Sequence, residues 1–196
     1  MGEEIGGNAV FGGLWNITTD GWFLPDTPYN ILDRCGHNAV PMITCANLGE
    51  LTGPGLVHAP DIIPAYMKIN TAANKTGNRG YIGIFDQVPG NFREEGGVSA
   101  HAMELHFVFG NVDDPQPWER LSYMYQAAGA KSELPVITDA ERKVSEEMMQ
   151  MWTAFARTGN PSVPGLIDWP DWDETTDKYL YIVDPLQVKT GFSRLV

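Results

Sequence analysis

The fold of this chain is decided by the stretch from Val40 to Glu50, which reads VPMITCANLGE. Its centre, Met42 to Ala46, is a short apolar run that Pro41 and Asn47 bound. A run of this length between turn-forming residues predicts a buried strand. Buried parallel strands need cover on both faces of their sheet and a neighbouring strand on each edge. The stretch therefore predicts a layered fold built around a sheet.

The residues after this strand supply the next elements of such a fold. Two further apolar runs, residues 81–86 (YIGIFD) and 179–183 (YLYIV), predict strands. From Asp61 to Ala73 the apolar residues have a spacing that suits a short amphipathic helix, with Pro64 tolerated in its first turn. Strands that alternate with helices predict an α/β fold with a mainly parallel sheet. Because three strands make an incomplete sheet, we expect the chain to be part of a larger layered domain.

A long helix is predicted for residues 139–158. Thr138 and Glu141 form a capping box, in which each side chain accepts from a backbone N–H at the start of the helix. Gly159 suits the C-cap, and Pro161 prevents the helix from resuming. One face of the helix is apolar and would pack on the core: Val144, Met148, Met151, Trp152 and Phe155.

Composition argues against two classes of partner. A net charge of −12 repels phosphate backbones, and basic clusters that would hold the chain on an anionic membrane are missing, so we expect neither nucleic acid nor membrane as a partner. No run of about 18 apolar residues predicts a transmembrane helix. Residues 1–7 are acidic and glycine-rich, unlike a signal peptide, so the cytoplasm is the default location. Cys35 and Cys45 allow at most one disulfide; a buried free thiol is favoured for Cys45, and their pairing stays open.

The most specific pattern lies in the segment from Gly97 to Gly110, which reads GVSAHAMELHFVFG. Together with residues 40–50 it resembles the C-terminal part of the type-B carboxylesterases, the α/β-hydrolases that include the cholinesterases. The segment from His101 is similar to the family pattern His-x-x-Glu-Leu-x-Phe-Val-Phe-Gly. Further matches follow in the family's order, at residues 20–28 (DGWFLPDTP), 152–161 (WTAFARTGNP), 169–170 and 189–192. The resemblance implies that residues 20–196 are the C-terminal portion of an α/β-hydrolase domain, incomplete without its N-terminal part, behind a glycine-rich lead-in at residues 1–19.

The resemblance also implies catalytic roles for two residues. His101 would be the general base and then the general acid of a serine esterase, and Glu50 would orient its imidazole. Glu50 precedes His101, which fits the order Ser, acid, His of α/β-hydrolases. The gap between them is 51 residues (101 − 50), shorter than in most members of the family. No cofactor is needed for this chemistry.

Two other interpretations of the same segment are weaker. The residues around Ser99 begin like a nucleophile elbow, but His101 stands where the turn requires glycine. His101, Glu104 and His106 do not match the spacing His-Glu-x-x-His of a metal helix, so no metal site is expected. Residues 107–110 are expected to form a strand or turn. Glu104 is expected to hold the local backbone in place.

No Gly-x-Ser-x-Gly elbow occurs in the 196 residues. The nucleophile and the oxyanion hole are therefore expected on an N-terminal part, with a companion chain as their carrier, and the 196 residues alone are expected to be inactive. The expected substrate is a small carboxylic ester. The alternative is a non-catalytic interaction module derived from the esterase fold, which would have no need for both Glu50 and His101.

Overall fold

The computed structural model describes residues 18–52 and 62–195. These residues fall into two compact units, which divide between positions 37 and 38. The first unit contains helix α1 (Pro28–Asp33). It begins at Thr27, whose hydroxyl accepts a hydrogen bond from the N–H of Asn30, and Pro28 occupies the first helical position, where its missing N–H is not needed. The predicted glycine-rich lead-in lies largely outside the described residues.

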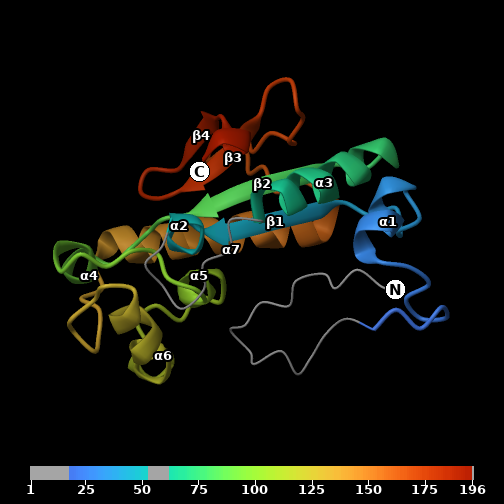
Figure 1. The fold of residues 1–196 in the computed structure, drawn as a ribbon. Coiled ribbons are helices and arrows are strands. Elements are labelled where there is room, and N and C mark those ends of the chain that lie inside the picture. The colour runs from blue at the N-terminus through green and yellow to red at the C-terminus, as the bar shows by residue number, and fades with distance from the viewer. Residues whose placement is uncertain (1–17, 53–61, 196) are drawn as a thin grey trace. The chain divides into compact units, whose positions relative to one another are not determined.

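The second unit is built on a four-stranded sheet in the order β1-β2-β3-β4 (Figure 1). Strands β1 (Met42–Asn47), β2 (Gly80–Phe85) and β3 (Lys178–Ile182) are parallel, and β4 (Gln187–Thr190) pairs antiparallel with β3. The three predicted strands are therefore present within a residue or so of their expected bounds, and the mainly parallel α/β sheet is confirmed. Strand β4 was not predicted.

Helices cover both faces of this sheet (Figure 1). Helix α3 (Ile62–Lys75) and the 3₁₀ turn η2 (Phe192–Arg194) lie on one face, and α7 (Asp139–Thr158) lies on the other. The other helices of this unit are α2 (Leu48–Thr52), α4 (Gly90–Glu94), α5 (Met103–Val108) and α6 (Pro115–Ala127). The predicted α3 is present, although its expected start at Asp61 lies outside the described residues. Within the described residues, no helix is both long and apolar enough to cross a bilayer.

The alternation of side chains along β2 divides the core into two clusters. Ile82 and Ile84 point to the face that α3 and η2 cover, where Ile63 and Phe192 pack. Tyr81 and Phe85 belong to the larger cluster on the opposite face. Every residue of β2 is buried, as expected of a central parallel strand.

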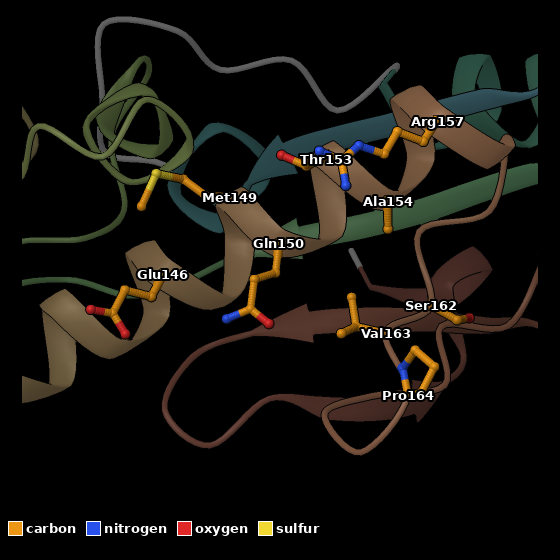
Figure 2. Close-up of a pocket in the computed structure, with 9 residues that line it drawn as sticks. All are labelled: Glu146, Met149, Gln150, Thr153, Ala154, Arg157, Ser162, Val163 and Pro164. Atoms are coloured by element: carbon orange, nitrogen blue, oxygen red, sulfur yellow. The ribbon is translucent and has the colours of Figure 1, made fainter.

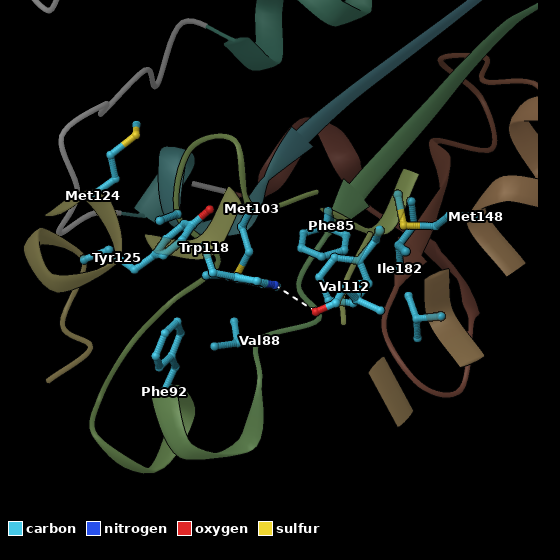
Figure 3. Close-up of a cluster of buried hydrophobic side chains, with 14 of the residues drawn as sticks. Phe85, Val88, Phe92, Met103, Val112, Trp118, Met124, Tyr125, Met148 and Ile182 are labelled. Atoms are coloured by element: carbon cyan, nitrogen blue, oxygen red, sulfur yellow. Dashed lines mark hydrogen bonds between the residues drawn. The ribbon is translucent and has the colours of Figure 1, made fainter. Parts of the chain in front are cut away.

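The larger cluster joins α5, α6 and α7 to the sheet. Figure 3 shows part of this cluster, in which Trp118 of α6 donates its indole N–H to the carbonyl of Val112 at 2.9 Å. Helix α7 contributes Val144, Met148 and Met151, all fully buried, from its predicted apolar stripe. The predicted capping box of Thr138 and Glu141 is confirmed.

One local prediction is wrong in part. Residues 107–110 were expected to form a strand or turn; Phe109 and Gly110 do form a turn, but Phe107 and Val108 are the last residues of α5. Helix α5 starts after Ala102, which adopts the left-handed conformation with φ 69°, and it buries Met103 and Phe107, four residues apart, on one side. The apolar run is therefore helical because both large side chains reach the core from the same face.

Candidate functional site

Glu50 lies directly after β1, in α2, at the carboxyl end of the sheet (Figure 1). The turn from strand to helix is closed by its own side chain, because Glu50 Oε2 accepts the backbone N–H of Asn47 at 2.9 Å. The residue is only 7% exposed. This contact occupies one carboxylate oxygen and leaves Oε1 for a second partner.

That second partner is His101, whose Nδ1 lies 2.5 Å from Glu50 Oε1. His101 stands in the loop between α4 and α5, after β2, and parallel strands bring both loops to the same edge of the sheet. The His101 side chain is 41% exposed. Among the described residues, no hydrogen-bond partner is found for its Nε2. The structure thus brings together the two residues that the sequence indicated. One ring nitrogen of His101 is held by Glu50, and the other has no partner in the part of the chain that the structure describes.

A hydrogen bond between Gly49 and Ser99, called the seam below, holds the two loops against each other. The N–H of Gly49 donates to the carbonyl of Ser99 at 3.1 Å, and it lies 3.2 Å from the Ser99 hydroxyl oxygen. A Cβ at position 49 would lie 2.5 Å from that carbonyl oxygen, so only glycine permits the approach. Gly49, which precedes Glu50, is therefore held against Ser99, which lies two residues before His101.

Asn47 forms a second connection between these loops. Its amide Nδ2 donates to the carbonyl of Ala100 at 2.8 Å and to Glu104 Oε2 at 2.5 Å. Glu104 thus receives a hydrogen bond from the strand end, in addition to its place in the first turn of α5. Sequence reasoning missed the role of Asn47, although its place at the end of a buried strand was a signal.

The charges around His101 favour its protonated form. The hydrogen bond to Glu50 raises the pKa of His101 above its usual 6.5, against the opposing effect of burial, and the charge of Glu104 acts in the same direction as Glu50. Burial raises the pKa of Glu104, which the hydrogen bond from Asn47 partly offsets. An imidazole held this way can accept a proton at Nε2, because the carboxylate at Nδ1 stabilises the resulting imidazolium.

None of the six serines in the sequence is hydrogen-bonded to His101, and all six lie in described residues. Ser99 is fully buried, and its hydroxyl donates to Asp86 Oδ1 at 3.2 Å. The geometry therefore places no serine nucleophile of this chain at Nε2.

His106 is part of the core. Its ring stacks on Trp118 with centroids 3.8 Å apart, and its Nε2 lies 2.5 Å from the Tyr125 hydroxyl. Burial lowers the pKa of His106 to about 4. Within residues 18–52 and 62–195, no three His, Cys, Asp or Glu side chains gather as a metal site would require. Cys35 and Cys45 are free thiols.

A hollow beside α7 does not contain the Glu50–His101 pair. It is a groove of about 500 Å³ between the outer face of α7, at Met149 and Ala154, and the loop at Val163 and Pro164 (Figure 2). A polar hollow of about 440 Å³ lies beside Asp86, also apart from His101. Neither of these hollows therefore forms a substrate pocket around His101.

Comparison with known proteins identifies relatives of this arrangement. The model of the carboxylesterase family matches residues 61–194, more than half of the chain. The para-nitrobenzyl esterase of Bacillus subtilis is 36% identical over 89 residues, which are 45% of this chain and 15% of that protein. Carboxylesterase 3 of Pongo abelii is 27% identical over 162 residues, 81% of this chain and 26% of that protein. The chain therefore spans about a quarter or less of the length of these relatives.

Solved structures agree with the fold. A carboxylesterase of Geobacillus stearothermophilus, EST55, superposes with a TM-score of 0.63 over 89% of this chain and 42% of its own. At 16% sequence identity this likeness concerns the fold alone. It supports the α/β-hydrolase architecture expected from the sequence, present here in part.

Proposed function

The chain belongs to the carboxylesterase family, and on this premise we propose that it supplies the acid and the base of a serine ester hydrolase. The single observation that carries the proposal is the 2.5 Å contact of Glu50 Oε1 with His101 Nδ1 at the carboxyl edge of the sheet. Two side chains 51 residues apart meet there, with the other oxygen of Glu50 already held by Asn47. A lone surface ion pair would not need this support.

In the proposed reaction, Nε2 of His101 takes the proton of a serine hydroxyl as the serine oxygen bonds to the acyl carbon of a carboxylic ester. The imidazolium then gives this proton to the departing alcohol. A water molecule repeats the sequence, which releases the acid and frees the serine. Glu50 holds the imidazole in the tautomer with the proton on Nδ1 and stabilises the imidazolium.

We assign the serine and the oxyanion donors to polypeptide outside these 196 residues, on a longer form of the same polypeptide or on a companion chain. Three facts support the assignment: the absent Gly-x-Ser-x-Gly elbow, the hydrogen bond that occupies buried Ser99, and the small share of the relatives' length that the chain covers. The open edge of β1, which pairs only with β2 among the described residues, could accept a further strand.

The test is native isolation of the tagged chain from the cells that make it, followed by an ester hydrolysis assay. We expect the isolated assembly to release p-nitrophenol from a short-chain ester, with a loss of about a thousandfold or more in His101→Ala. The recombinant 196 residues alone should hydrolyse the ester no faster than their own His101→Ala variant. An isolated assembly without hydrolysis, or with hydrolysis that ignores His101→Ala, would overturn the proposal and favour a non-catalytic module.

A further inference from the structure

A series of hydrogen bonds connects the loops of Glu50 and His101, through Ser99 and Asp86, to the end of β2. Ser99 is fully buried, and its hydroxyl can donate one hydrogen bond while its lone pairs accept others. It donates to Asp86 Oδ1 at 3.2 Å. Its oxygen then faces the N–H of Gly49, 3.2 Å away, beside the acid.

Asp86 is itself held from three sides. Its backbone N–H donates to the carbonyl of Ile182 in β3 at 2.9 Å. Its Oδ2 accepts the hydroxyl of Tyr181, also in β3, at 2.5 Å. Arg93 of α4 donates to its carbonyl at 2.7 Å and lies 3.7 Å from Oδ2. The carboxylate is therefore a fixed acceptor, which sets the direction of the Ser99 hydroxyl.

We infer that Asp86 and Ser99 are positioning residues, which hold His101 at hydrogen-bonding distance from Glu50. The inference rests on the proposed function, because the position of His101 against Glu50 matters only if the two act as base and acid. Asp86 touches neither member of the pair and acts through Ser99. Ser99 joins the histidine loop to the turn of the acid, since its carbonyl and its hydroxyl oxygen both lie within reach of one N–H.

Removal of the Ser99 hydroxyl should loosen the hold on the His101 loop without changing any charge. Gly49 keeps the carbonyl of Ser99 as an acceptor, so Ser99→Ala is expected to fold. The contact of His101 with Glu50 should weaken, and the pKa of His101 should fall toward its ordinary value. We expect a large part of the rise that the Glu50 hydrogen bond causes in the pKa of His101 to be lost.

The experiment is an NMR titration of the His101 ring in the complete, isotope-labelled 196-residue chain. The matched control is Ser145→Ala, since Ser145 is also buried and donates its hydroxyl to a backbone carbonyl, that of Phe107, at 2.8 Å. A general loss of stability affects both variants, but only Ser99→Ala should move the pKa of His101. Equal pKa values of His101 in Ser99→Ala and Ser145→Ala would overturn the inference.

Substitutions of Asp86 test the same link if Ser99→Ala fails to fold. Asp86→Asn keeps an oxygen that can accept from Ser99, whereas Asp86→Ala does not, and both remove the charge. We expect a lower pKa of His101 in Asp86→Ala than in Asp86→Asn, and equal values would count against a positioning role. Glu50→Gln separates the two proposals: if the pKa of His101 is the same with and without the Glu50 carboxylate, the acid–base pair itself fails.

Discussion

Protonation of His106 should destabilise the fold in acid. The ring is 2% exposed, stacked on Trp118 and in contact with the Tyr125 hydroxyl, and burial lowers its pKa from 6.5 to about 4. Between these two values the unfolded chain binds a proton that the folded chain does not. Stability therefore rises with pH across this window, and it is lost as the pH falls through it.

The size of the effect follows from the two pKa values. Between about pH 7.5 and pH 5 the linkage relation gives a loss of about 2 kcal/mol from this side chain alone. The informative variant is the double substitution His106→Phe with Tyr125→Phe. It keeps an aromatic ring against Trp118 and removes the titrating group together with the hydroxyl that would otherwise lose its partner.

The assay is urea unfolding of the wild type and the double variant at both pH values. We expect the wild type to lose about 2 kcal/mol more than the double variant on acidification. The Tyr125→Phe variant is the control, because it keeps His106 and should keep most of the pH dependence. Burial raises the pKa of Tyr125, so its hydroxyl does not titrate in this pH range, and all other titrating groups are shared. Identical losses in the wild type and the double variant would therefore show that His106 is not the source of the pH dependence.

Three further outcomes are expected. Gly49→Ala should separate the seam, because its Cβ would lie 2.5 Å from the Ser99 carbonyl oxygen, and an NMR titration should find the pKa of His101 lowered; an unchanged pKa would contradict the seam. Thr138→Ala should lower the free energy of unfolding of the chain by about 1 kcal/mol in a urea titration, whereas Thr138→Ser should preserve it; equal losses in both would argue against the capping box. The raised pKa of His101 stabilises the fold below pH 6.5, and this stabilisation is lost as the pH rises through the folded-state pKa. Urea unfolding should therefore find Glu50→Gln less stable than the wild type at about pH 6, by less than about 1 kcal/mol because the ring is so exposed. The difference in stability should be smaller at about pH 8.5. A gap that grows with pH would contradict that sign.

Sequence reasoning succeeded where the signal is local. Both ends of α7 follow from side chains within a turn of them, Thr138 with Glu141 at the start and Gly159 at the end. The strands were found because each is a short apolar run between turn residues. Helix α6 was not predicted, although it carried a signal of the same kind: Asp114 accepts the N–H of Gln116, and a proline follows at the first helical position.

The failures concern contacts that depend on the tertiary fold. The apolar run at Phe107 has no clear period of its own, and its helical state depends on which side faces the core. The link from Ser99 to Asp86 joins a loop to a strand end 13 residues earlier, and only the placement of β2 beside β3 makes Asp86 a fixed acceptor. The pair of Glu50 and His101 was found through family motifs, which carry information that spacing alone does not.

We propose that this chain contributes the base and the acid for a serine that lies outside these 196 residues. The most direct test is to treat the natively isolated assembly with a fluorophosphonate, which reacts with an activated serine, and to locate the modified residue by mass spectrometry. We expect one modified serine, in a peptide outside these 196 residues, and no labelling of that serine in His101→Ala. A modified Ser99, or labelling that persists in His101→Ala, would contradict the proposed function.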